Sequence, residues 1–160
     1  MAVAVLKHAT RFGFAAILFF HASLCLAQRD GLRFEVTLAP SLESGALDGR
    51  MLLLLSSRDD DEPRFHVVNR RTPQPFFGVD VDGLTPGQAA VFDETVLGYP
   101  LQSLGEIPAG EYYVQALLNR YQTFHRADGH VVKLHMDQWE GQKWNRSPGV
   151  LISHAQYRCD

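Results

Sequence analysis

The stretch "RMLLLLSS", residues 50–57, decides the fold. It holds five consecutive apolar residues between polar neighbours. A short apolar run with such boundaries is typical of a β-strand that is buried on both faces. The earlier stretch "RFEVTLA", residues 33–39, alternates Phe34, Val36 and Leu38 with polar side chains. This period of two predicts a strand with one buried face.

The rest of the chain continues as short strands separated by turns, and no window of helical length shows a 3.6-residue period. Further strands are expected at residues 64–68 ("RFHVV"), 76–81, 88–92 and 112–119. Residues 121–137 predict a hairpin whose Ala-Asp-Gly turn lets Gly129 adopt a positive φ. Pairing Arg126 with His130 in this hairpin places Tyr121 opposite His135. We therefore expect an all-β protein, a single immunoglobulin-like β-sandwich of about seven strands.

The N-terminus has the organisation of an export signal. Lys7 and Arg11 precede an apolar core over residues 12–20, and Ala27 is a small residue of the kind that a signal peptidase recognises. His21 interrupts the apolar run, whereas a membrane anchor needs about 20 apolar residues, so we expect no stable membrane span. The chain then divides into three expected segments: a signal peptide over 1–27, a β-sandwich domain over 28–149 and an irregular C-terminal tail over 150–160.

Removal of the signal leaves an acidic domain. It takes away two of the 15 basic residues against 18 acidic ones, so the formal charge becomes −5. Such a chain lacks the basic field that attracts nucleic acid. Cys25 leaves with the signal and Cys159 stays alone, so no internal disulfide can form. We expect a periplasmic or secreted protein that is held together by apolar burial.

The polar motifs predict no metal, cofactor or catalytic residue. His125, His130 and His135 are spaced by five, and on strands this spacing turns successive side chains to opposite faces, so they do not converge on an ion. The acidic stretch 59–62 lacks the ligand spacing and glycine of an EF-hand loop and is expected to be a solvated turn. No serine lies in a Gly-x-Ser-x-Gly elbow.

The stretch "HMDQWEGQKWNRSPG", residues 135–149, contains both tryptophans. If exposed, they would form a stacking platform for a sugar ring; otherwise they close the sandwich or pack against a following domain, which is the interpretation we favour. The residues expected to dock a partner or bind a ligand are Trp139 and Trp144, with Asp137, Glu140 and Arg146 as polar contacts at the rim. We expect at least one tryptophan to be more than about a third exposed or to lie beside a poorly packed tail.

Four stretches, "PQPFFGVDVDGL", "LGYPLQSL", "IPAGEYYVQALLNRYQTFHRADGH" and the tryptophan stretch, resemble the N-terminal region of large exported bacterial proteins related to enterochelin esterases. The resemblance covers about residues 33–149 and implies a β-sandwich segment that precedes an α/β-hydrolase domain. The catalytic residues of such proteins belong to the hydrolase domain, so none is carried over to this chain. After Gly149 the sequence "VLISHAQYRCD" departs from that pattern.

Three functions follow from these observations. The first is a non-catalytic accessory domain of an exported esterase-type hydrolase, in a truncated product or a stand-alone paralogue, with a missing or separate α/β-hydrolase domain as its partner. The second is a carbohydrate-binding or cell-envelope-binding module that uses Trp139, Trp144 and Tyr121. The third is a weak hydrolase in its own right, whose residues come together only in the fold.

Overall fold

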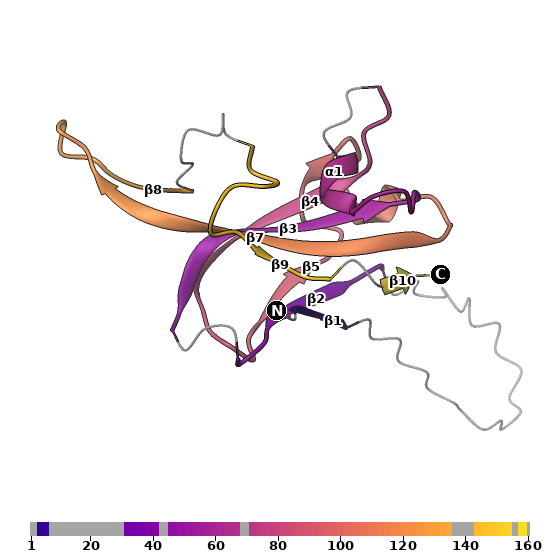
Figure 1. Cartoon of the computed structure of the whole chain (residues 1–160), viewed down its shortest axis with the longest axis horizontal. Helices are drawn as coiled ribbons and strands as arrows, with labels where there is room; N and C mark the ends of the chain where they lie inside the picture. The colour runs from indigo at the N-terminus through magenta and orange to yellow at the C-terminus, as the bar shows by residue number, and fades with distance from the viewer. Residues whose placement is uncertain are drawn as a thin grey trace, which may run out of the picture.

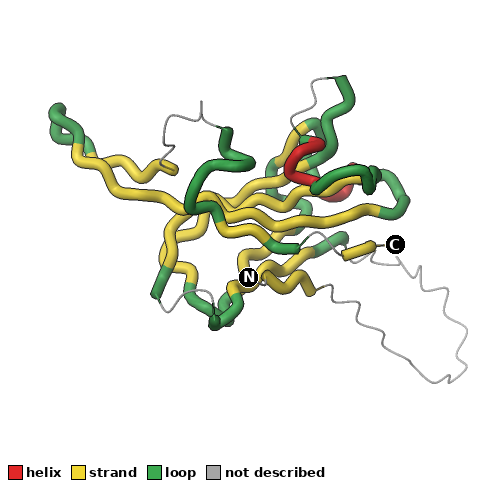
Figure 2. Tube along the Cα trace, viewed as in Figure 1, coloured by secondary structure: helices red, strands yellow, loops and turns green. Residues whose placement is uncertain are grey.

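A computed structural model describes residues 3–6, 31–41, 45–67, 71–135, 143–154 and 157–159. It is an all-β protein built from antiparallel sheets, as the alternating sequence predicted (Figures 1 and 2). The strands are β1 (Val3–Leu6), β2 (Phe34–Leu38), β3 (Leu47–Ser56), β4 (Phe76–Leu84), β5 (Ala89–Phe92), β6 (Gly98–Tyr99), β7 (Tyr112–His125), β8 (Val131–His135), β9 (Leu151–Ile152) and β10 (Tyr157–Cys159). The helical elements are α1 (Pro63–His66) and the 3-10 turn η1 (Leu104–Glu106).

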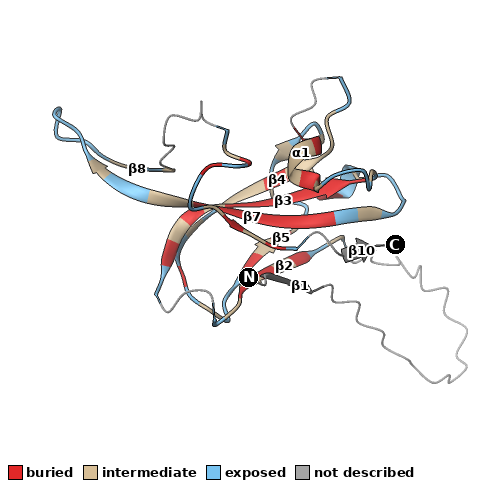
Figure 3. Ribbon diagram, viewed as in Figure 1, coloured by how far each residue is buried: buried red, intermediate tan, exposed pale blue. Residues whose placement is uncertain are grey.

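Strand β3 lies at the centre of the larger sheet, whose strand order is β10-β7-β3-β4-β6. It pairs with β7 on one edge and with β4 on the other. All six residues from Met51 to Ser56 are buried, whereas the first four residues of the strand alternate between buried and partly exposed (Figure 3). The prediction from "RMLLLLSS" of a strand buried on both faces is confirmed.

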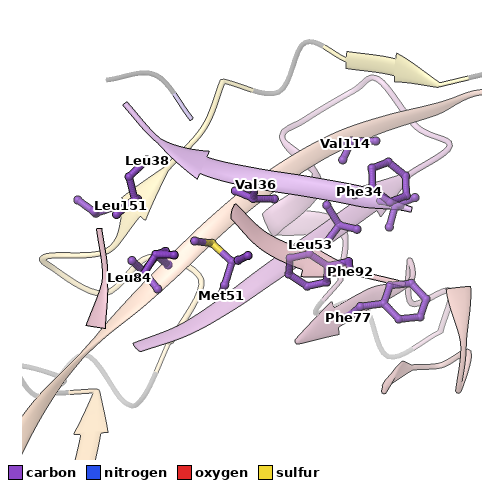
Figure 4. Close-up of a cluster of buried hydrophobic side chains, with 14 of the residues drawn as sticks. Phe34, Val36, Leu38, Met51, Leu53, Phe77, Leu84, Phe92, Val114 and Leu151 are labelled. Carbon is purple, nitrogen blue, oxygen red and sulfur yellow. The ribbon is translucent and has the colours of Figure 1, made fainter. Parts of the chain in front are cut away.

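The inner face of β3 contributes to the main hydrophobic core. The smaller sheet, in the order β1-β2-β5, supplies Phe34 and Phe92, and the larger sheet supplies Met51, Leu53 and Phe77 (Figure 4). All five side chains are at most 1% exposed. The expected one-sided burial of β2 is confirmed by its strict alternation of buried and partly buried residues. β1 lies within the segment expected to be a signal and pairs with β2.

The outer face of β3 has a second, smaller core. Leu52 and Leu54 pack there with Val67 and Leu117. Val67 directly follows the short helix α1, so the strand expected at residues 64–68 is wrong in its described part, which extends to Val67. Pro63 explains the difference, because proline at the first turn of a helix presets the helical φ and removes no needed hydrogen bond.

Three short strands follow one edge of β7. β8 pairs with its distal end, β9 with its middle and β10 with its beginning. The residues that make hydrogen bonds at this edge are even-numbered, so their backbone groups point the same way. These residues are Ala116, Arg120 and Arg126. The edge of β7 is thus paired by what amounts to one interrupted strand. The C-terminal tail, which we expected to be irregular, contains two of its pieces, because β7 offers unpaired backbone groups that this segment satisfies.

The longest interruption is the tryptophan stretch. Tyr121 of β7 faces His135, and Leu118 of β7 faces Leu151. Three steps along β7 therefore match sixteen steps along the partner segment, which is thirteen residues longer than a continuous ladder between β8 and β9 would need. This insertion returns to the sheet through residues 143–150, where Trp144 and Val150 pack on the outer core.

The distal half of β7 and β8 form an arm that projects from the sheet (Figure 1). Its register is the predicted one, with Tyr121 opposite His135 and Gly129 at φ 86° in the turn. Lys133 fastens the arm by donating to Asp48 and Asp82, each at 2.7 Å. The bond from Lys133 lowers the pKa of Asp48 to about 2.

No helix among the described residues has the length and apolar composition needed to cross a membrane.

Burial on both faces of β3 gives a test by paired truncation. Leu53→Ala and Leu54→Ala, on opposite faces, should each lower the free energy of unfolding by about 2–5 kcal/mol, because each leaves a cavity. Leu134→Ala on the arm, where the side chain is 56% exposed, should change it by less than about 0.5 kcal/mol. Urea unfolding measures all three. A Leu54→Ala variant as stable as Leu134→Ala would show that the outer core contributes little.

Candidate functional site

The structure brings Ser56, His66 and Asp60 together at the end of β3. Ser56 Oγ lies 2.7 Å from His66 Nδ1, and both side chains are buried, at 0% and 4% exposure. His66 Nε2 lies 3.2 Å from Asp60 Oδ1. These are the residue types of a serine hydrolase, and sequence analysis missed them because Ser56 and His66 are ten residues apart and a strand was expected at His66.

Two features distinguish this cluster from an accessible catalytic triad. Ser56 Oγ donates to the carbonyl of Arg58 and accepts from the Arg58 amide, so the hydroxyl is engaged by the chain that follows it. His66 Nε2 is buried and without a hydrogen bond, since its short distance to Asp60 lacks the required direction. A substrate carbonyl has no access to an oxygen that is fully buried.

A polar network beside this turn holds α1 and the insertion on the sheet. The side chain of Gln115, buried on the outer face of β7, accepts from the Arg64 amide and donates to Glu62 at 2.6 Å. Asn145 donates to the Arg64 carbonyl at 2.9 Å, and Arg64 returns a bond to the Asn145 carbonyl at 3.2 Å. The network therefore joins three segments that are far apart in sequence: the loop around residue 62, strand β7 and the tryptophan insertion.

Glu62 is the charged member of the network. Arg64 donates two hydrogen bonds to its carboxylate, at 3.0 and 3.1 Å, and this pairing holds the pKa of Glu62 below its ordinary value. Partial burial opposes the effect, and the bond from Gln115 adds to it. The charged form of Glu62 is therefore the one that stabilises the folded chain.

A hollow of about 240 Å³ lies at the base of the arm. Its lining residues come from β7, from the end of β8 and from the end of the insertion: Arg120, Tyr121, Gln122, His135, Pro148 and Gly149. His135 Nδ1 lies 3.0 Å from the Arg120 carbonyl and must carry the proton, which leaves Nε2 as a buried atom without a partner. Tyr121 donates to Asp80 at 2.7 Å. Burial, more than this bond to a carboxylate, raises the pKa of Tyr121.

Of the residues expected to dock a partner, the structure describes two. Trp144 is half-buried, with its ring centroid 5.7 Å from that of Phe76. Arg146 is exposed and stacks on Phe65 at 4.8 Å, on a ring that Arg64 also contacts at 4.3 Å. Trp139, Asp137 and Glu140 lie outside the described residues, so the expectation about the exposure of at least one tryptophan stays a prediction.

The three evenly spaced histidines all lie on the arm formed by β7 and β8. His125 faces Val131 across the arm and His135 faces Tyr121, while His130 lies in the turn region beside Asp128. Within the described ranges, no group of three or more His, Cys, Asp or Glu side chains is arranged to hold a metal ion.

Comparisons with family models, with curated proteins and with solved structures find no match to this chain. The resemblance to the N-terminal region of esterases therefore has no support from these comparisons.

The Glu62 carboxylate predicts a specific pH dependence of stability. Because its folded pKa lies below the ordinary 4.5, its contribution is present above about pH 4.5 and is lost as the pH falls through the folded value. Glu62→Gln should therefore be less stable than wild type at pH 6, and the difference should shrink as the pH falls below about 4.5. Urea unfolding across this range measures it.

Asp59→Asn is the matched control, since Asp59 is an exposed acid in the same loop. It should leave the pH profile of the wild type unchanged. A Glu62→Gln variant with a constant stability deficit from pH 6 to pH 3 would contradict the role given to the charged carboxylate.

Proposed function

We propose that this chain is a non-catalytic accessory domain of an exported esterase-type hydrolase, with an α/β-hydrolase domain as its partner. The observation that carries the non-catalytic part is the burial of Ser56. Of the described residues, Ser56, His66 and Asp60 come closest to a hydrolytic triad, yet the serine oxygen is 0% exposed and bonded to Arg58. The hydrolase partner is proposed from the sequence resemblance alone.

The arm supports a docking role. A two-stranded ribbon is marginally stable by itself in water, and this one projects from the sheet with Val131 57% exposed and Leu134 56% exposed. Apolar side chains in such a position are those that a neighbouring domain would cover. As part of the same proposal, the two facing sheets form an immunoglobulin-like sandwich of about seven strands, an arrangement that keeps the ends of such a domain free for a neighbour.

The absence of catalysis is tested with p-nitrophenyl acetate and butyrate. The purified chain should hydrolyse both at the rate of the buffer blank, because its serine oxygen is inaccessible. Ser56→Ala and His66→Gln should match the wild type. Turnover above the blank that either variant abolishes would make the buried cluster a catalytic site and overturn the proposal. Turnover that survives in both would place a reaction elsewhere in the chain and overturn it equally.

Export is tested by the mature N-terminus. When the chain is expressed in a bacterium with its first 27 residues, intact-mass analysis of the purified protein should give a chain that begins at Gln28. β1 would then be removed, but β2 keeps its pairing with β5 and its buried side chains, so near-UV circular dichroism should show a folded domain. A protein that retains Met1 would contradict the signal peptide.

A further inference from the structure

Three aromatic side chains form a row on the outer face of the larger sheet. Tyr99 and Phe76 are direct cross-strand partners on β6 and β4, with ring centroids 6.1 Å apart. Trp144 approaches the same Phe76 ring at 5.7 Å from the insertion. Phe76 and Trp144 are half-buried, whereas Tyr99 is 55% exposed. This aromatic row, Tyr99, Phe76 and Trp144, leaves ring surface open to solvent.

Two basic residues lie next to Trp144 in the chain, and the Arg146 guanidinium lies over the Phe65 ring at 4.8 Å. Lys143 and Arg146 lie on either side of Trp144 in a turn closed by a hydrogen bond from the Arg146 amide to the Lys143 carbonyl at 2.8 Å. Both side chains are exposed, and neither forms an ion pair with any carboxylate that the structure describes. The chain as a whole is acidic, with a formal net charge of −3. Two exposed cations with no acidic partner among the described residues indicate a local attraction for an anion on this otherwise acidic protein.

We propose that the aromatic row binds an acidic polysaccharide, a chain of sugar rings that carry carboxylates. The negative faces of aromatic rings attract the C–H groups on the apolar face of a sugar ring, and Tyr99 offers a hydroxyl at the rim as well. The Arg146 guanidinium can take a carboxylate through two parallel hydrogen bonds, and the Lys143 ammonium supplies a second positive charge. Rings and cations together therefore match a ligand that has both flat apolar faces and regularly spaced negative charges.

The arrangement favours a sugar chain over an acidic peptide. The row offers ring faces, tilted by 54° and 36° to their neighbours, in place of the deep pockets that peptide side chains require. Sugar faces repeat along a polysaccharide, whereas peptide side chains do not. The acidic protein as a whole repels a polyanion, so binding of one requires a local site. This surface lies apart from the arm, and its ligand does not depend on whether the chain serves a hydrolase.

The test is a titration of the full chain against a fluorescein-labelled oligogalacturonate, followed by fluorescence anisotropy. Saturable binding is expected at low ionic strength, with affinity falling as salt is raised. Tyr99→Ala should weaken binding about fivefold through lost stacking. Lys143→Gln and Arg146→Gln should each weaken it about two- to fivefold, as exposed charge pairs do. The two cation variants change surface residues only, so they keep the test valid if Tyr99→Ala folds poorly.

Tyr113→Ala is the matched control, because Tyr113 is an exposed tyrosine on β7 that takes no part in the row. It should bind like wild type. Neutral dextran has sugar rings without charge, and poly-glutamate of similar length has charge without sugar rings. Both should bind at least about tenfold more weakly than the oligogalacturonate. No saturable binding, equal binding of poly-glutamate or dextran, or binding that Tyr99→Ala and both cation variants leave unchanged would each overturn the proposal.

Discussion

The burial of β3 on both faces is the constraint on which the rest of the structure depends. Its apolar run places leucines alternately on the two sides of the sheet, and each side has to be covered. The smaller sheet covers one side with Phe34 and Phe92, and α1 with the returning insertion covers the other. A strand in this position, paired on both edges and buried on both faces, fixes the register of β4 and β7, because a slip by one residue would exchange the two cores.

The tryptophan stretch follows from the same requirement. β7 is long enough to pair with β8, β9 and β10 in succession, and the described end of the insertion, residues 143–150, packs Trp144 and Val150 on the outer core. Trp144 takes its place beside Phe76, and Asn145 is bonded to Arg64, so the insertion and α1 hold each other on the sheet. Covering the core and presenting Lys143 and Arg146 to solvent are thus two results of one turn.

Much of the fold could be predicted from local pattern. The alternation of apolar and polar residues predicted β2, and the apolar run predicted β3. The hairpin turn at Gly129 predicted the correct partner for Tyr121. The strand prediction for residues 64–67 failed because a short apolar-polar pattern fits a strand or a helix, and Pro63 in the first turn favours the helix. Sequence could not place Ser56 beside His66 or Tyr99 beside Phe76, because these contacts depend on tertiary packing. The motif pointed to Trp144 and Arg146, and the sheet supplied the rest of the aromatic row.

Native-state hydrogen exchange tests the central position of β3 most directly. The amides of residues 51–55 should exchange only through global unfolding, with opening free energies equal to the stability measured by urea, since this strand is paired on both edges and buried on both faces. The amides of residues 131–135 on the arm should exchange much faster through local opening. The account predicts this ranking. Amides of β3 that exchange as fast as those of the arm would contradict it, because the two covering layers would then not be stabilising the strand between them.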